Sequence, residues 1–240
     1  MLFKNTGLSA ESELLLCCAR THVDIEQAER IRSLIGADID WESLIRLAAR
    51  HAMMPLLHWN LNAICPKAVP HIVLDLLRRS FELNALKNRF FAKELVRLLH
   101  LFEEHGVLAF PYKGPLLAVA AYSNLSLRQF GDLDIVVREL DSAKARDLLI
   151  GQGFELQVPS NKPDYFKDRY DYHLRGKDGR VNVEIHWSFT RTYWPFPYAV
   201  DRLWKRLAPV SFAGATVLSP PTEDLLLIPA RTGPNTAGSA

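Results

Sequence analysis

The sequence predicts an α/β (α+β) protein in which an all-helical N-terminal region precedes a small mixed β-sheet flanked by helices. Two observations predict this class. Residues 1–105 repeat apolar side chains at helical spacing, whereas from residue 106 short apolar runs alternate with helical segments. The composition, 48% hydrophobic and 23% charged, excludes a disordered or fibrous chain. We therefore expect a helical region over residues 1–105, an α/β core over 106–210, and the start of a helical C-terminal region over 211–240.

The N-terminal region contains three predicted helices. Asp24 and Asp40 suit the N-cap position, because a short carboxylate accepts the free N–H groups of a first turn. One helix follows Asp24, and a second is expected over residues 41–59. The third, over 71–105, has no internal Gly or Pro and ends at Gly106, a residue type that is frequent after a helix.

The α/β core is predicted to alternate strands with helices. Pro115 suits a helix start, where its missing N–H would have no partner. Asp178-Gly179 predicts a hairpin, because Asp-Gly favours tight hairpin turns. The expected elements are a strand at 107–112, a helix at 116–122, a strand at 132–137, a helix at 141–152 capped by Asp141, a strand at 154–158, and a hairpin that joins 172–175 to 180–187.

Charge and cysteine content limit the partners and the cellular compartment that we expect for this protein. The formal net charge of +2 is too mild to indicate a nucleic-acid binder, which normally carries a clustered basic face. No apolar run approaches the roughly 18 residues needed to cross a bilayer. The N-terminus is charged and does not resemble a secretory signal. Three cysteines without metal-site spacing indicate reduced thiols. We expect a cytoplasmic protein without membrane association.

The segment Gly131-Asp132-Leu133-Asp134 is the strongest indication of chemistry. On a strand, Asp132 and Asp134 lie on one face, roughly 7 Å apart, and Leu133 points into the core. Two neighbouring carboxylates repel each other unless a cation neutralises them. Mg²⁺ suits this position because it takes one or two carboxylates together with substrate phosphates. The alternative is a solvated strand face that carries two aspartates.

A second strand supplies further polar groups. In residues 181–187 the apolar side chains share one face, whereas Asn182, Glu184 and His186 share the other. If this strand lies beside residues 132–137, Glu184 becomes a third carboxylate at the site. Three carboxylates on two strands could hold two divalent ions. A half-buried strand with a wet face is the alternative.

Lys113-Gly114-Pro115 lies where a strand meets a helix N-terminus. Free N–H groups attract anions there, and Gly permits the close approach of a phosphate. Arg128, four residues before Asp132, is a second candidate phosphate contact. Taken alone, Lys113 is more readily interpreted as an exposed surface lysine, and Arg128 could likewise be a surface arginine.

Taken in order, Tyr112-Lys113-Gly114, Arg128, Gly131-Asp132-Leu133-Asp134 and Val183-Glu184-Ile185-His186-Trp187 resemble the uncharacterised nucleotidyltransferases of the polymerase-beta-type superfamily. The resemblance covers residues 103–204 and implies a nucleotidyltransferase core.

The resemblance implies that Asp132, Asp134 and Glu184 hold two Mg²⁺ ions, and that Lys113, Gly114 and Arg128 bind a nucleoside triphosphate such as ATP. A nucleoside monophosphate then passes to an acceptor hydroxyl, and pyrophosphate leaves. Glu184 is the first candidate to take the proton of the acceptor hydroxyl, and His186 is the second. The acceptor and the base of the nucleotide stay open.

Two other functions are compatible with these residues. An Asp-x-Asp glycosyltransferase also holds a divalent ion, but it does not explain Glu184 and His186 on a second strand. A nucleotide-sensing or partner-binding relative could keep the fold without catalysis. The turn at Lys113-Gly114-Pro115 favours this second alternative, since the superfamily usually has Gly-Ser or Gly-Gly there.

The C-terminal segment changes character after about residue 228. Residues 220–228 begin as a capped apolar helix, whereas residues 229–240 show no apolar periodicity. One allowed back-translation of residues 231–240, read in another frame, encodes a His-Gly-Ala-Lys-His-Arg-Trp segment of the kind that relatives in the resembled family carry there. We therefore expect a frameshift after about residue 228, beyond which the intact protein continues as further helices.

Overall fold

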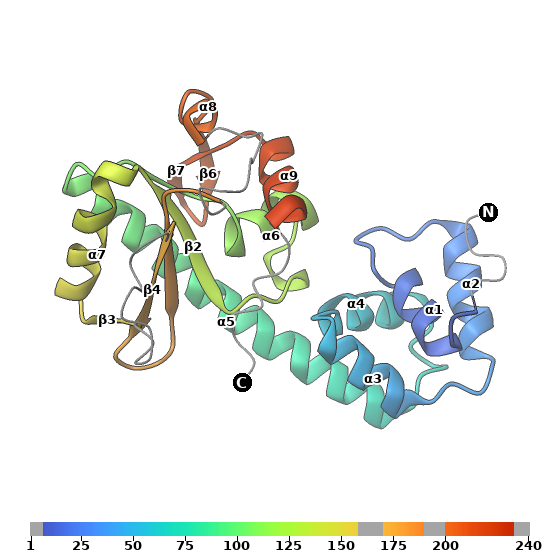
Figure 1. Cartoon of the computed structure of the whole chain (residues 1–240). Helices are drawn as coiled ribbons and strands as arrows, with labels where there is room; N and C mark the ends of the chain where they lie inside the picture. The colour runs from blue at the N-terminus through green and yellow to red at the C-terminus, as the bar shows by residue number, and fades with distance from the viewer. Residues whose placement is uncertain (1–6, 158–169, 190–199, 233–240) are drawn as a thin grey trace. The chain divides into compact units, whose positions relative to one another are not determined.

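The computed structural model describes residues 7–157, 170–189 and 200–232 (Figure 1). The chain forms two compact units. Residues 1–88 and 124–129 make the first, called here the helical unit. Residues 89–123 and 130–240 make the second, called here the sheet unit. The predicted boundary between residues 105 and 106 stays a prediction.

The helical unit is built from short helices and the first half of a long one. Asp24 and Asp40 are N-caps as predicted: Asp24 accepts a hydrogen bond from the Gln27 N–H at 2.8 Å, and Asp40 accepts one from the Ser43 N–H at 3.0 Å. The elements are α1 (Ala10–Cys17), α2 (Ile25–Ile35), α3 (Trp41–Arg50), α4 (Met54–Ile64), α5 (His71–Glu104) and the 3-10 turn η1 (Leu125–Leu127).

The prediction of one helix over residues 41–59 is wrong. The helix α3 ends at Arg50, the backbone of Ala52 turns into the left-handed region with φ 55°, and α4 begins at Met54. Pro55 is the physical reason, because proline clashes with the preceding turn inside a helix but fits a first turn. The long helix predicted over 71–105 is confirmed as α5, and Gly106 with φ 68° follows it.

Five of the described strands of the sheet unit form a mixed sheet in the order β1-β2-β5-β4-β3, which confirms the predicted fold class. The strand β2 runs parallel to β5, and the other neighbouring pairs are antiparallel. The predicted hairpin is present as β4 and β5. Residue 158 of the predicted third strand lies outside the described residues. The strands are β1 (Ala109–Pro111), β2 (Asp132–Val137), β3 (Phe154–Leu156), β4 (Asp171–Gly176) and β5 (Asn182–His186).

Two helices pack against this sheet: α6 (Gly114–Tyr122) contacts β2, and α7 (Ser142–Gly151) contacts β3 and β5 (Figure 1). Pro115 occupies the second helical position, because α6 already begins at Gly114. Asp141 is at the N-cap of α7 but makes no capping hydrogen bond. It ends the 3-10 turn η2 (Glu139–Asp141), so its backbone is helical rather than extended.

The C-terminal part of the sheet unit begins with α8 (Val200–Trp204) and an antiparallel hairpin that the sequence analysis did not predict. The strands β6 (Ala208–Phe212) and β7 (Ala215–Ser219) are joined through Ala213 and Gly214, whose positive φ values of 49° and 83° suit a tight hairpin turn. Residues 211–219, where the sequence analysis expected a helical C-terminal region to begin, therefore lie in this hairpin.

The helix predicted over residues 220–228 follows that hairpin and is α9 (Thr222–Thr232). The frameshift stays a prediction, and residues 233–240 lie outside the described part of the chain. Among the described helices, none combines the length and the apolar character needed to cross a bilayer.

Candidate functional site

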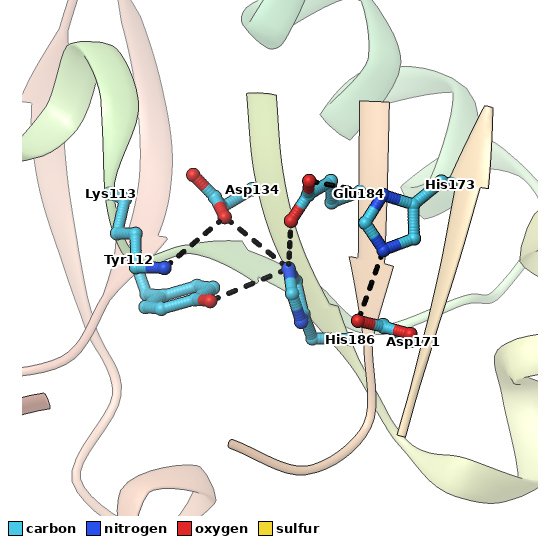
Figure 2. Close-up of polar contacts among 7 residues, drawn as sticks. All are labelled: Tyr112, Lys113, Asp134, Asp171, His173, Glu184 and His186. Carbon is cyan, nitrogen blue, oxygen red and sulfur yellow. Dashed lines mark hydrogen bonds and ion pairs between the residues drawn. The ribbon is translucent and has the colours of Figure 1, made fainter. Parts of the chain in front are cut away.

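Three neighbouring strands place polar side chains in rows on one face of the sheet. Asp134 on β2 lies opposite Glu184 on β5, and Glu184 lies opposite His173 on β4. Two residues further along the same pair of strands, His186 on β5 lies opposite Asp171 on β4. Because side chains two residues apart share a face, these groups converge (Figure 2). The adjacency of Asp134 and Glu184 that the sequence suggested is thus present.

The imidazole of His186 links the two carboxylates from inside the sheet unit. Its Nε2 lies 3.3 Å from Asp134 Oδ1 and 3.3 Å from Glu184 Oε2 (Figure 2). The Tyr112 hydroxyl approaches the same nitrogen at 3.4 Å. His186 is only 2% exposed, so water competes little with these contacts. The side chain therefore holds one oxygen of each carboxylate in place.

Lys113 and Gly114 lie at the start of α6, at the edge of this group. Lys113 is buried, with its Nζ 3.6 Å from Asp134 Oδ1 and 4.8 Å from the centre of the Tyr112 ring, so it is not an ordinary surface lysine. Gly114 has φ 53°, and a Cβ there would lie 3.3 Å from the Asp132 carbonyl oxygen. The backbone conformation and the close approach both favour glycine at this position.

Ionic contacts shift the acidities of the central groups. Burial alone would lower the pKa of His186, but the carboxylates of Asp134 and Glu184 close to its ring raise that pKa to about 9. Hydrogen bonds to Asp171 and Glu184 raise the pKa of His173 to about 9. Burial opposes ionisation of Glu184, yet the two histidines hold the pKa of its carboxyl well below the usual range. Glu184 is therefore ionised throughout the physiological range.

The arrangement suits a bound cation. Asp134 Oδ1 is buried without a hydrogen bond of acceptable geometry, although Lys113 and His186 approach it. Among the described residues, Asp134, Glu184 and His186 offer ligand atoms that all lie within 4.8 Å of one another. Carboxylate oxygens are the ligands that hard divalent ions prefer. The two carboxylates and the oxygen without a hydrogen bond therefore fit a divalent metal, whereas a protonated His186 imidazole has no lone pair to offer it.

The structure treats the remaining predicted residues differently. Asp132 begins β2 opposite Asn182, half-buried and outside the compact group of three ligand atoms. Arg128 follows η1 in the helical unit. Its carbonyl oxygen accepts hydrogen bonds from Asn84 at 3.2 Å and Asn88 at 2.7 Å. These two buried amides on α5 fix the backbone that carries Arg128.

The sequence analysis missed three members of the cluster: Tyr112, Asp171 and His173. Tyr112 is buried, and its ring meets the His186 ring edge-on with 5.2 Å between centroids. His173 and Asp171 could have been found by counting back from the Asp-Gly turn, because the hairpin register sets His173 against Glu184. The turn was identified, but the pairing it imposes was not followed along β4.

A mixed sheet that presents clustered carboxylates from parallel strands, beside a lysine at a helix N-terminus, places the protein in a class whose side chains could hold a divalent ion next to a phosphate. The family comparison names the group within that class. A family model described as an uncharacterised nucleotidyltransferase matches residues 37–231, and the chain belongs to this family. The enzyme class predicted from the sequence, a nucleotidyltransferase, is thereby confirmed.

Comparison with solved structures gives several matches. One is the crystal structure of the lincosamide antibiotic adenylyltransferase LnuA with lincomycin bound. It is 18% identical to this chain, the match covers 56% of this chain and 83% of that chain, and the TM-score is 0.42. A comparison with curated proteins gives no match.

Proposed function

We propose that the chain moves a nucleoside monophosphate from a nucleoside triphosphate, with ATP as the first candidate, to an acceptor hydroxyl and releases pyrophosphate, in a cytoplasmic setting. The observation that carries the proposal is the pair Asp134 and Glu184, which lie side by side on parallel strands with a buried Asp134 oxygen that lacks a hydrogen bond. Family membership favours this reaction over the glycosyltransferase alternative.

Two Mg²⁺ ions are the proposed cofactor, with Asp132, Asp134 and Glu184 as the residues that would hold them. When bound, such ions increase the acidity of an attacking hydroxyl and balance the charge of a leaving pyrophosphate. Asp132 shares the sheet face of Asp134, two residues away on β2, so both carboxylates project to the same side.

Lys113 and Gly114 are proposed to bind the triphosphate. They begin α6, whose free N–H groups favour anions, and Gly114 leaves room for close approach. Lys113 adds a positive charge beside Asp134. Arg128 is proposed as a further phosphate contact, on a backbone that Asn84 and Asn88 hold.

Glu184 is proposed to take the proton of the acceptor hydroxyl. It is ionised and lies directly beside Asp134. His186, the second candidate for this role, is better suited to lie between the two carboxylates, because an Nε2–H directed at them has no lone pair free for a proton. No covalent intermediate is needed, since phosphoryl-type transfer depends mainly on positioning and charge stabilisation.

Calorimetric titration with each common nucleoside triphosphate, in the presence and absence of Mg²⁺, tests the proposal. We expect one or more triphosphates to bind only with Mg²⁺. Asp134→Asn should abolish this binding because it removes a carboxylate charge without changing the size of the side chain. Asp147→Asn on α7 is the matched control, since its side chain is exposed and pairs only with Arg146 in the ion pairs described.

A folded wild-type protein that binds no triphosphate would overturn the proposal. Binding without pyrophosphate release, over a panel of acceptors that carry hydroxyl groups, would instead support the nucleotide-sensing or partner-binding alternative. If Asp134→Asn retains full Mg²⁺-dependent binding, the metal does not depend on this carboxylate, and the assignment of the site is wrong.

A further inference from the structure

We propose that His173, held by Asp171, is a positioning residue that fixes the Glu184 carboxylate in the orientation needed to bind metal. The inference rests on the proposed function, in which Glu184 is a metal ligand. It adds two residues that neither the sequence motifs nor the family match assign to the site.

Contacts between β4 and β5 carry this inference. His173 Nδ1 lies 3.1 Å from Glu184 Oε1, and His173 Nε2 lies 3.2 Å from Asp171 Oδ2 (Figure 2). The strand register sets His173 directly opposite Glu184, so the contact follows from the backbone pairing. Asp171 and His173 are two residues apart on β4 and project from the same face.

The chemistry of the three groups fixes the direction of both hydrogen bonds. A carboxylate at neutral pH can only accept, so the imidazole donates from both nitrogens. A ring that donates at both ends cannot rotate without losing two charge-assisted hydrogen bonds. Asp171, which is 7% exposed, therefore anchors the ring, and the ring anchors Glu184.

Glu184 is consequently held through both of its oxygens. Oε1 meets His173 on β4, and Oε2 meets His186 on its own strand. Each carboxylate oxygen has a second lone pair, so a metal ligand role stays available. The two contacts select one orientation of the carboxylate beside Asp134. Partners of this kind around metal ligands typically contribute about 10–100-fold in metal affinity.

The two nitrogens of His173 can be tested separately. Asn places its amide nitrogen near the position of Nδ1, which faces Glu184, whereas Gln reaches toward the position of Nε2, which faces Asp171. Leu removes both donors at similar volume. The probe is Mn²⁺ alone, with its binding followed by electron paramagnetic resonance, and thermal unfolding is measured for every variant. His105→Asn is the control, because His105 lies at the end of α5 and its Nδ1 contacts the Leu101 carbonyl oxygen.

We expect His173→Leu to weaken Mn²⁺ binding about 10–100-fold. We expect His173→Asn to recover most of the affinity and His173→Gln to recover little of it. A merely structural role would change the unfolding temperature but not the affinity of the folded protein, and it would not separate Asn from Gln. If the Leu variant fails to fold, the comparison of Asn with Gln decides.

Either of two results would overturn this inference while leaving the proposed function intact. One is a Mn²⁺ affinity of His173→Leu equal to that of wild type, and the other is a Mn²⁺ affinity that His173→Gln recovers as fully as His173→Asn does. Failure of the proposed function has a different signature. In that case wild-type protein binds no Mn²⁺ at all, and this inference falls with it.

Discussion

The two units of the chain bury different kinds of polar side chain. Among the described residues, the buried polar side chains of the helical unit are neutral amides and one histidine, namely His58, Asn60, Asn84 and Asn88. Those of the sheet unit include a lysine, carboxylates and a histidine, namely Lys113, Asp134, Asp171, Glu184, His186 and Asp224, beside Ser142 and Ser219.

Neutral amides satisfy backbone groups, and they add stability at little electrostatic cost. The Asn60 amide lies 2.9 Å from both the Cys18 and the Arg20 carbonyl oxygens. Buried charges are costly and stabilise a fold only when they are well paired. The concentration of buried charge in the sheet unit therefore supports the proposal that its carboxylates hold the metal.

Histidines make the comparison sharper, because the same side chain is shifted in opposite directions. Burial lowers the pKa of His58 in the helical unit. His186 is more deeply buried, yet its pKa is raised to about 9 because Asp134 and Glu184 lie against it. Carboxylate neighbours, rather than depth of burial, thus account for the opposite pKa shifts of these two histidines.

The largest effect on stability is expected from the apolar core of the helical unit. Leu44 on α3 is fully buried, and Leu44→Ala removes apolar contacts and leaves a cavity. We expect a loss of about 2–5 kcal/mol in the free energy of unfolding of this unit. Urea denaturation followed by circular dichroism measures the change. Metal binding by the folded variant should stay at the wild-type level, because no group of the site is touched.

Leu140→Ala is the matched control for this prediction. Leu140 is 95% exposed, so its truncation should change stability by less than about 0.5 kcal/mol. A Leu44→Ala protein as stable as wild type would contradict the description of this core. Weaker Mn²⁺ binding by the folded variant would contradict the separation of roles between the two units.

The central site could be predicted from the sequence because strand periodicity is strict. Alternation placed Asp132 with Asp134 and Glu184 with His186 on single faces, and a parallel pairing then brought Asp134 beside Glu184. Lys113 was located by the strand-to-helix turn, but its burial depends on tertiary packing. Asp171 and His173 carry no local signature, since their roles arise from the pairing of strands. Tyr112 was named only as part of the Tyr112-Lys113-Gly114 motif, and its contact with His186 depends on tertiary packing.

The fold was predictable where local chemistry acts alone. Residues close together in the sequence determine three of its features. These are the helix of 34 residues without internal Gly or Pro, the caps at Asp24 and Asp40, and the Asp-Gly hairpin. The hairpin β6–β7 was missed because its turn is Ala213-Gly214, a weaker signal than Asn-Gly or Asp-Gly. The break before Pro55 was missed because apolar periodicity continues across it.

The opposite histidine shifts predict a pH dependence for metal-free protein. His173 and His186 have pKa values near 9 in the folded state against an ordinary 6.5, so the folded state retains protons that the unfolded state releases. Their contribution to stability is complete below about pH 6.5 and is lost as the pH rises toward 9. Urea denaturation at several pH values, with a chelator present, should show a free energy of unfolding that falls over this window.

His186→Asn should reduce that decline, because it removes one of the two groups that cause it. His58→Gln is the control: the pKa of His58 is lowered by burial, so its protonation costs stability only below about pH 6.5. It should leave the alkaline slope unchanged. A flat profile between pH 6.5 and 9, or an equal slope in His186→Asn, would contradict the assignment of protons to the sheet unit.

The smallest effect concerns helix caps, where the two units again differ. Asp24 accepts a hydrogen bond from the Gln27 N–H at the start of α2, whereas Asp141 at the start of α7 makes no such bond. Removing a capping side chain typically costs about 1 kcal/mol. We therefore expect Asp24→Ala to lower the free energy of unfolding by about that amount, and Asp141→Ala to leave it nearly unchanged. Both variants remove an aspartate at a helix start, exposed at Asp24 and half-buried at Asp141, so urea denaturation compares loss of the hydrogen bond with loss of the charge near the helix dipole. Equal losses in the two variants would mean that the charge, rather than the cap, stabilises these helices.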